Sequence, residues 1–351
     1  MKIHEFYMKR AVELALKNNQ GARPNPSVGA VIVSENKVIG EGFTSNYGGN
    51  HAEINALNQI RKENLPLLKK ATLYVTLEPC SHIGKTPPCS LAIIQSGISK
   101  VVIGCQDPNP LVAGKGITML KAANVDITTG VLEKECAETH RQFLTFINQK
   151  RPYITLKWAM SKDGFIAPLK DQQTKPGSYW LSHSLSKQWA HKLRAYSMGI
   201  VIGAETLRYD QPSLNTRIWA GQDPAILIIG GKLSDIPSTW HNKQVSIIQF
   251  TKTPEKQNSS IHQIAIEDSS KTLNLLLNHC IEHQIQTLLI EGGTQVINEF
   301  LKCNLWDEAI IFIGNTNLIE GVKAPTIDQK QVKIMNSASD KVIIQRNSAN
   351  Q

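Results

Sequence analysis

The sequence predicts two α/β domains that meet near residue 150. A length of 351 residues is typical of two domains of ordinary size. Short apolar runs alternate with amphipathic segments through both halves, which is typical of mostly parallel sheets covered by helices. The polar segment Gln149-Lys150-Arg151-Pro152 separates the two series. We therefore predict one domain over residues 1–148 and a second over residues 149–351.

Periodicity assigns the elements of the first half in order. Residues 7–16 form an amphipathic helix, and a Ser-Glu-Asn turn joins strands at residues 28–33 and 38–43. A proline at the first helical position suits a helix start, so Pro88 opens a short helix. The remaining predictions are helices at residues 51–61, 88–95, 117–123 and 132–148 and strands at residues 72–77 and 100–104.

The second half carries its own alternating series. Its predicted strands are residues 153–160, 200–203, 225–229, 245–250, 287–291 and 309–313, and its predicted helices are residues 185–196, 272–283 and 294–302. After about Asp328 the chain is polar and weakly patterned, so we expect poor packing there.

Composition narrows the class of protein. Hydrophobic residues make up 41% of the chain and charged residues 19%, which is enough to build a core in each half. No apolar run reaches the ~18 residues that a membrane span needs, and Glu5 and Glu13 interrupt the N-terminal segment, so no signal peptide is expected. The net charge of +9 is scattered, so it suits a phosphorylated small substrate without indicating a nucleic-acid surface.

The six cysteines are too sparse for a disulfide framework and favour a reducing, cytoplasmic compartment. Only Cys80 and Cys89 lie in a motif. His51-Ala52-Glu53 is followed by Pro79-Cys80 and Pro88-Cys89, which follows the known His-x-Glu and Pro-Cys signature of zinc deaminases. Eight residues separate the two cysteines here, where that signature has two.

The residue types explain the chemistry. Zinc binds imidazole nitrogen and thiolate sulfur, and a catalytic site keeps one tetrahedral position open for water. We expect His51, Cys80 and Cys89 to hold the ion and Glu53 to move protons without binding it. A structural zinc site would have a fourth ligand, for which His82 is the candidate; the alternative is that His82 faces the substrate.

Several polar segments lie at predicted strand ends, where open sheets bind ligands. Asn25 sits between two prolines and either bonds the substrate or only forms a turn. The segments Asp107-Pro108-Asn109-Pro110 and Gly114-Lys115-Gly116 carry the same two interpretations.

In the second half no G-x-G-x-x-G follows a strand, so a Rossmann fingerprint is absent. Glu291-Gly292-Gly293-Thr294 ends a strand and opens a helix whose N–H groups could hold a cofactor phosphate, unless the glycines form only a turn. Arg194 and Arg217 either grip a substrate phosphate or are solvated surface arginines.

Taken together, these motifs resemble the bifunctional deaminase-reductase family of riboflavin biosynthesis. The first half contributes Arg23-Pro24-Asn25-Pro26-Ser27-Val28-Gly29, His51-Ala52-Glu53, Glu78-Pro79-Cys80-Ser81-His82, Gly84-Lys85-Thr86-Pro87-Pro88-Cys89 and Asp107-Pro108-Asn109-Pro110. The second contributes Lys157-Trp158-Ala159-Met160-Ser161-Lys162-Asp163-Gly164, Ser178-Tyr179-Trp180-Leu181-Ser182, Arg194, Thr206-Leu207-Arg208-Tyr209-Asp210, Leu214-Asn215-Thr216-Arg217 and Glu291-Gly292-Gly293. The long gap between the cysteines is specific to that group.

The resemblance implies a cytidine-deaminase-like three-layer domain followed by a dihydrofolate-reductase-like domain. It implies zinc-dependent deamination of 2,5-diamino-6-ribosylamino-4-pyrimidinone 5′-phosphate, and then NADPH-dependent reduction of the ribosyl group to ribityl. The expected ligand is a phosphorylated pyrimidine, with no nucleic acid or membrane partner, and a homo-oligomer is expected. The family's substrate contacts fall on Ser178, Arg194, Leu214, Arg217 and Glu291, and its NADPH contacts on Met160, Trp180, Thr206, Asp210 and Gly293.

Two departures from the family pattern predict local differences. Lys162 replaces a usual apolar residue, which would alter the cofactor face, and residues 315–324 do not follow the usual pattern at the closing edge of the reductase. Three alternatives remain open: a deaminase acting on nucleic acid, a zinc-stabilised scaffold without activity, and a deaminase with a silent reductase.

Overall fold

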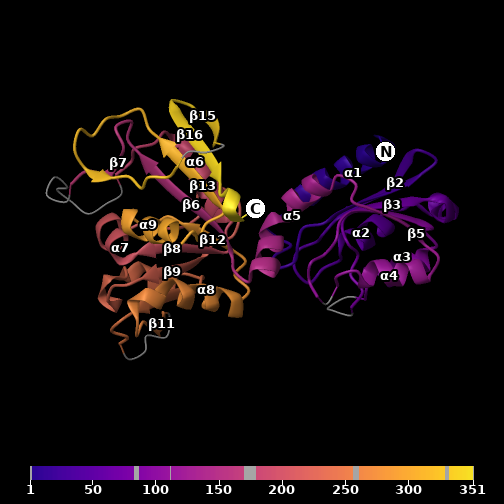
Figure 1. Cartoon of the computed structure of the whole chain (residues 1–351), viewed down its shortest axis with the longest axis horizontal. Coiled ribbons are helices and arrows are strands. Elements are labelled where there is room, and N and C mark those ends of the chain that lie inside the picture. Colours follow the sequence, from indigo (N-terminus) through magenta and orange to yellow (C-terminus); the bar gives the residue numbers. More distant parts are fainter. Residues whose placement is uncertain are drawn as a thin grey trace. The chain divides into compact units, whose positions relative to one another are not determined.

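The computed structural model describes residues 2–82, 87–110, 112–169, 179–255, 261–328 and 332–350. The chain divides into two compact units, Met1–Lys150 and Arg151–Gln351, which Figure 1 separates by colour. The division falls within the polar segment that contains Pro152. None of the described helices is both long enough and apolar enough to cross a membrane.

The first unit is built on a five-stranded sheet. Its strands are β1 (Gly29–Ser34), β2 (Lys37–Phe43), β3 (Thr72–Leu77), β4 (Lys100–Cys105) and β5 (Asp126–Thr129), in the order β2-β1-β3-β4-β5. The sheet is mixed: β2, β3, β4 and β5 run in one direction, and β1 runs antiparallel to both of its neighbours. The cause is local: Glu35 and Asn36 both adopt positive φ and form a two-residue hairpin between β1 and β2.

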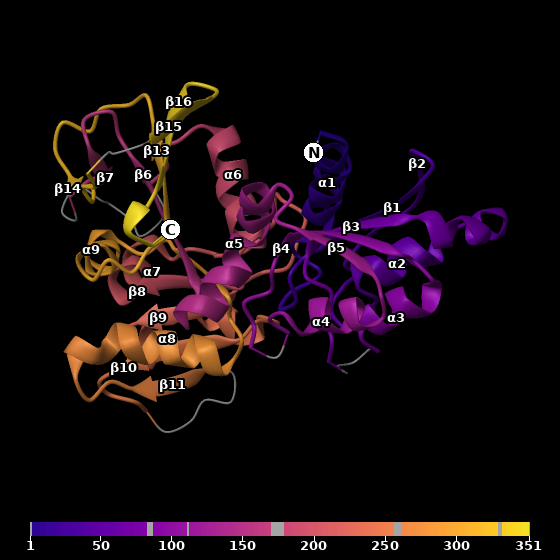
Figure 2. The ribbon, with the colours of Figure 1, turned by 45° about the vertical axis from the view of Figure 1, so that its right-hand side comes forward.

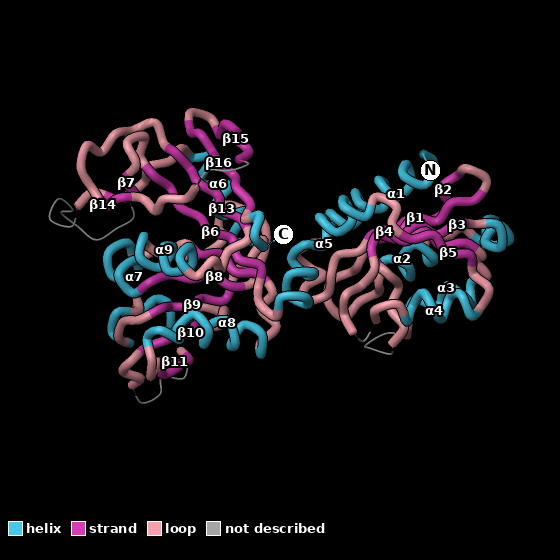
Figure 3. Tube along the Cα trace, in the orientation of Figure 1, coloured by secondary structure: helices cyan, strands magenta, loops and turns pink. Residues whose placement is uncertain are grey.

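Helices cover both faces of this sheet. They are α1 (Lys2–Ala15), α2 (Ala52–Asn58), α3 (Cys89–Ser96), α4 (Lys115–Ala122) and α5 (Glu133–Gln149). Met8 and Cys136 place α1 and α5 in one buried cluster, whereas Ala56, Ile93 and Leu120 place α2, α3 and α4 in the other. Figure 3 shows the strands of this unit between the two sets of helices, which confirms the three-layer prediction.

The second unit has a nine-stranded sheet in the order β11-β10-β9-β8-β12-β6-β13-β16-β15. Its strands are β6 (Tyr153–Met160), β8 (Gly199–Gly203), β9 (Ala225–Ile229), β10 (Ile247–Thr251), β11 (His262–Ala265), β12 (Thr287–Ile290), β13 (Glu308–Ile313), β15 (Val332–Ser337) and β16 (Asp340–Arg346). All pairs from β11 to β13 are parallel. A separate ladder joins β7 (Phe165–Ala167) to β14 (Val322–Lys323), and the helices are α6 (Ser184–Ala195), α7 (Ala204–Asp210), α8 (Thr272–Glu282) and α9 (Thr294–Lys302).

The prediction of poor packing after Asp328 is wrong. Strand β16 pairs antiparallel with the whole of β13, and Val342 and Ile343 are buried. Strand β15 completes the edge as a hairpin with β16 and is largely exposed. An edge strand with one solvated face needs few apolar residues, which is why its sequence carries so weak a pattern.

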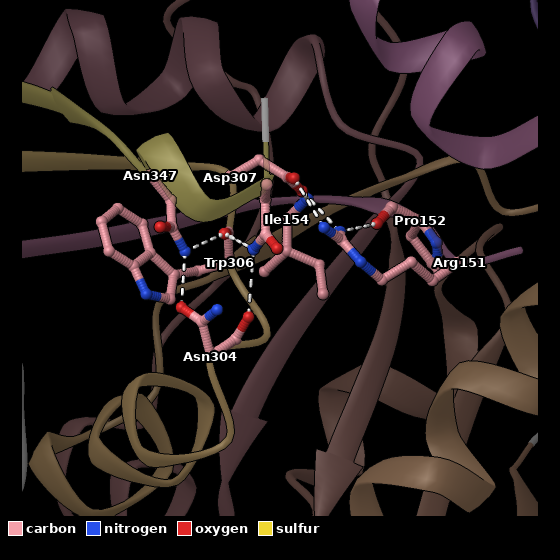
Figure 4. A network of polar contacts seen from close by, with 8 residues as sticks. Arg151, Pro152, Ile154, Asn304, Trp306, Asp307 and Asn347 are labelled. Atoms are coloured by element: carbon pink, nitrogen blue, oxygen red, sulfur yellow. Dashed lines mark hydrogen bonds and ion pairs between the residues drawn. The ribbon is translucent and has the colours of Figure 1, made fainter. Parts of the chain in front are cut away.

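A buried polar network ties the start of the second unit to its C-terminal end (Figure 4). Arg151 forms two hydrogen bonds of 2.7 Å with the carboxylate of Asp307, which also accepts the backbone N–H of Ile154 at 2.7 Å. Next to it, Asn347 donates to the side chain of Asn304 and to the backbone carbonyl of Trp306. These bonds hold β6, the start of β13 and the end of β16 together.

Candidate active sites

The strongest site in the first unit gathers His51, Cys80 and Cys89. His51 is the N-cap of α2, Cys80 follows β3, and Cys89 is the first residue of α3. The Nδ1 atom of His51 lies 3.6 Å from Sγ of Cys80 and 3.3 Å from Sγ of Cys89. The three ligand atoms all lie within 4.8 Å of one another.

This geometry fits a tetrahedral zinc ion. Zinc–nitrogen bonds of about 2.1 Å and zinc–sulfur bonds of about 2.3 Å at tetrahedral angles place a nitrogen and a sulfur ligand about 3.6 Å apart. The backbone N–H of Cys89 donates to Sγ of Cys80 at 3.3 Å. Hydrogen bonds from Cys89 and His51 lower the pKa of Cys80 to about 4, which favours the thiolate that zinc requires.

Among the described residues, the group that could hold a metal contains three ligands, and His82 is not one of them. His82 instead lines a cavity of about 310 Å³ next to the ligands. Three protein ligands leave the fourth tetrahedral position free, which is the arrangement of a catalytic zinc site.

Glu53 lies in the first turn of α2, two residues after His51, and lines the same cavity. Its side chain is buried, and burial, with a smaller contribution from Cys80, raises its pKa to about 7. A carboxyl group with a pKa near neutrality can both accept and donate a proton at physiological pH.

Polar groups from several loops converge on this cavity. They include Asn25 before β1 and both Asp107 and Asn109 after β4. Asp107 accepts the backbone N–H of Asn109 at 2.8 Å, and burial raises the pKa of Asp107 to about 6. Asn25 and the segment Asp107-Pro108-Asn109-Pro110 thus contribute residues to the cavity lining, where they can recognise a polar ring, whereas Gly114-Lys115-Gly116 is not part of the lining.

Glu78 has a supporting role that the sequence analysis did not assign. Its buried carboxylate accepts the backbone N–H groups of Gly114 and Ile117 at the start of α4. A Cβ atom on Gly116 would lie only 2.0 Å from the carbonyl oxygen of Pro79. Close packing of α4 against the Pro79-Cys80 segment thus requires glycine at position 116. The available signal was the position of this glutamate directly before Pro79-Cys80 in the sequence.

In the second unit, Arg194 on α6 and Glu291 after β12 form a buried ion pair. Nε and Nη2 of Arg194 lie 3.0 and 2.7 Å from the two carboxylate oxygens, and Nη1 donates to the carbonyl of Asn215. Burial alone would raise the pKa of Glu291, but Arg194 and Lys157 more than offset burial and lower it to about 2. The solvated-surface interpretation is therefore wrong for Arg194.

The charge of Lys157 on β6 acts on this pair, although Lys157 was not singled out as a site residue. The parallel register places Leu156 beside Ile290, so Lys157, in the middle of β6, and Glu291, just after the end of β12, are the next residues along these two neighbouring strands. Burial lowers the pKa of Lys157, which brings its amine closer to the range where it exchanges protons. A lysine in an otherwise mostly apolar strand was the available signal.

A second contact joins Thr206 on α7 to the glycine turn. The backbone N–H of Gly293, the N-cap of α9, donates to Oγ1 of Thr206 at 2.8 Å. Asp210 ends α7, and burial raises its pKa to about 6. These three expected cofactor residues thus lie on the two segments that follow β8 and β12, which are neighbours in the sheet.

The remaining expected reductase residues occupy different environments. Met160 ends β6 and Leu214 is buried. Arg217 is exposed, and its guanidinium donates a hydrogen bond to the side-chain oxygen of Asn215. Trp180 is 53% exposed, with Nζ of Lys187 3.9 Å from its ring centre. Ser178 lies outside the described residues.

The departures noted in the sequence have a structural context. Asp163 accepts the backbone N–H groups of Leu318 and Ile319 and the hydroxyl of Ser161. The backbone N–H of Lys162 donates to the carbonyl of Thr316. The segment after Gly314 is therefore attached to the turn that follows β6.

Comparisons with known families cover both units. Residues 1–105 match the family described as "Cytidine and deoxycytidylate deaminase zinc-binding region". Residues 152–338 match the family described as "RibD C-terminal domain".

Comparisons with individual proteins cover nearly the whole chain. The chain is 37% identical to riboflavin biosynthesis protein RibD of Aquifex aeolicus over 92% of its own length and 89% of that protein. It is 32% identical to RibD of Escherichia coli over 88% and 87%. Among solved structures, it is similar to the diaminohydroxyphosphoribosylaminopyrimidine deaminase/5-amino-6-(5-phosphoribosylamino)uracil reductase of Thermotoga maritima, with a TM-score of 0.84, 33% identity and coverage of 98% and 99%. Acinetobacter baumannii RibD gives a TM-score of 0.85 at 32% identity, with coverage of 98% of each chain.

Proposed function

Because the chain belongs to the family of riboflavin biosynthesis protein RibD, we propose that its two units act in succession on one phosphorylated pyrimidine. It is a bifunctional enzyme of riboflavin biosynthesis, with a zinc-binding deaminase domain and a reductase domain. The solved Thermotoga maritima relative is named for the substrates of its two reactions. We assign those substrates to this chain: diaminohydroxyphosphoribosylaminopyrimidine for deamination and 5-amino-6-(5-phosphoribosylamino)uracil for reduction.

The observation that carries the deaminase assignment is the position of Glu53 in the cavity beside three converging zinc ligands. Zinc bound at such a site lowers the pKa of water to about 7 and supplies a nucleophile at neutral pH. The Glu53 carboxylate would accept one proton from the attacking water and pass it to the ring nitrogen. It would then take the second proton, from the added hydroxyl group, and pass it to the amine, which leaves as ammonia. Asn25, Asp107 and Asn109 orient the ring by hydrogen bonds.

Replacing Glu53 by Gln tests this assignment. Zinc content should be unchanged, because Glu53 is not a ligand, whereas ammonia release should fall about 10²- to 10⁴-fold. Glu63→Gln, on an exposed glutamate of the same unit, is the matched control and should retain full activity. Undiminished ammonia release by zinc-loaded Glu53→Gln would contradict the assigned role.

For the reductase we propose NADPH as the hydride donor. The N-terminus of α9 supports a cofactor phosphate at the glycine turn, and the hydrogen bond from the Gly293 N–H to Thr206 holds that turn against α7. Met160, Trp180 and Asp210 are proposed to contact the rest of the cofactor, and Ser178, Leu214 and Arg217 to contact the substrate. Arg194 is proposed to hold the Glu291 carboxylate toward the ribosyl group, because its guanidinium is engaged by Glu291 and Asn215.

The informative test is NADPH oxidation after addition of the deaminated pyrimidine to the complete chain. Oxidation is expected with NADPH and much less with NADH. Arg194→Lys should weaken reduction, since a lysine cannot form the two-pronged pair with Glu291. That variant should leave ammonia release intact. If the correctly folded protein does not oxidise NADPH, the reductase proposal is contradicted, whereas the deaminase proposal still stands.

Two further expectations remain part of this proposal: a cytoplasmic location and a homo-oligomer. The paucity of cysteine motifs supports the first. Sedimentation of the purified chain would test the second, since a monomer at enzyme-assay concentrations would contradict it. Ammonia release from free nucleotides but not from single-stranded nucleic acid would separate this function from that of a nucleic-acid deaminase.

A further inference from the structure

Three histidines gather on the second unit where α8 covers the edge of the sheet. His279 lies in α8, His283 caps its C-terminal end, and His262 begins β11. Figure 2 shows α8 lying across β10 and β11. None of the three belongs to the residues assigned above to deamination or reduction.

The backbone places His279 and His283 on one face of the helix. They are four residues apart, and the backbone N–H of His283 donates to the carbonyl of His279 at 3.1 Å. Residues with this spacing are neighbours on a helix surface. Their ring centres are 4.3 Å apart.

That separation suits two ligands of one metal ion. Imidazoles bound at about 2.1 Å and at right angles to each other have ring centres about 4.5 Å apart. The pair also forms part of His279-Cys280-Ile281-Glu282-His283. The same His-x-x-Glu-His spacing supplies two helical zinc ligands in one class of metalloprotease. The 4.3 Å between the two ring centres adds a geometric observation to this spacing.

The surroundings leave the imidazoles available. Among the described residues, neither ring has a hydrogen-bond partner, although His279 is 92% buried and His283 is exposed. Phe250 packs edge-on against His279 at 5.9 Å, and His262 stacks on it at 6.3 Å. Packing therefore fixes the His279 ring without satisfying its nitrogens.

Charge also favours a cation ligand over a proton. Burial, followed by the neighbouring His283 and His262, lowers the pKa of His279, while Glu282 opposes this effect. A neutral imidazole is the form that binds a metal. Two neighbouring neutral imidazoles suit Ni²⁺, Cu²⁺ or Zn²⁺.

We propose that His279 and His283 form a second metal site, which binds a divalent transition-metal ion through both imidazoles, with water completing the coordination. The ion would fasten the last turn of α8 without taking part in either reaction.

The test uses untagged, full-length chain that carries zinc at its deaminase site, titrated with Ni²⁺ at pH 7.5. Calorimetry and metal analysis should find one Ni²⁺ bound per chain while the zinc content stays constant. His283→Gln, which changes an exposed side chain, should weaken nickel binding at least tenfold. His279→Gln should do the same, with circular dichroism used to verify its fold, because this side chain is buried.

His241→Gln is the matched control and should bind nickel as the parent chain does. Ammonia release should be the same in parent and His283→Gln, because the proposed site is separate from the deaminase. The proposal is overturned if His283→Gln binds nickel as tightly as the parent. It is also overturned if bound nickel equals zinc lost, since nickel would then occupy the His51, Cys80 and Cys89 site.

Discussion

The buried Arg151–Asp307 pair offers a sharp test of how the second unit is held together. In Asp307→Asn the side chain keeps its shape but loses the charge that faces Arg151. Both side chains are less than 10% exposed, and the carboxylate accepts three hydrogen bonds of 2.7 Å. Removing one partner of a buried pair typically costs about 3–5 kcal/mol, because the other charge stays buried and unpaired.

For a unit of roughly 200 residues, each kcal/mol lowers Tm by about 2–4 °C, so we expect a decrease of roughly 6–20 °C. Tryptophan fluorescence can follow the unfolding of this unit, since all six tryptophans lie at or after Trp158. Tryptophan emission on heating therefore reports on the second unit alone.

The control is Arg208→Gln, which breaks the ion pair with Asp235, in which the Arg208 side chain is 45% exposed. An exposed pair contributes about 0–1 kcal/mol, so this variant should lower Tm by no more than a few degrees. If Asp307→Asn shifts the tryptophan transition no further than Arg208→Gln does, the network in Figure 4 does not stabilise the unit as argued.

Three further predictions concern the sheet ends and edges. The Glu291 pKa of about 2 lies below its ordinary value of 4.5, so its ion pair stabilises the fold fully above about pH 4.5 and loses that effect as pH falls toward 2. The stability difference between the parent chain and Glu291→Gln, measured by tryptophan emission in urea, should shrink over that range; a constant difference would contradict the pKa. Gly116→Ala should reduce zinc retention during dialysis against a chelator, because its Cβ atom would displace Pro79 next to Cys80; retention equal to the parent's would show that the segment yields freely. Deleting residues 332–351 should abolish the cooperative tryptophan transition, since it exposes β13 and removes the buried Val342 and Ile343; an unchanged transition would mean that β16 is dispensable.

Much of the deaminase site could be predicted because its signal is local. His51 and Glu53 are two residues apart, and each cysteine follows a proline at a strand end or helix start. Zinc chemistry restricts which residue types can occupy such positions. The length of the segment between Cys80 and Cys89 then pointed to one family, which the comparisons confirm.

The reductase site is less visible because its groups come from distant segments. Arg194 pairs with Glu291, and the charge of Lys157 acts on both, only when β12 pairs in parallel between β6 and β8 and α6 packs nearby. The sequence alone left Arg194 either as a phosphate ligand or as a surface residue. Only the folded structure gave its guanidinium the carboxylate of Glu291 as a partner.

The sequence by itself thus determined the fold class and predicted the zinc ligands and a division near residue 150, because periodicity, residue chemistry and proline placement act over a few residues. Tertiary structure decided which strands run antiparallel, why the polar C-terminal segment folds, and where Arg151 and Arg194 find their partners. The physical reason is that an edge strand or a buried charge is stabilised by partners far away in the chain. The neighbouring residues in the sequence therefore do not identify those partners.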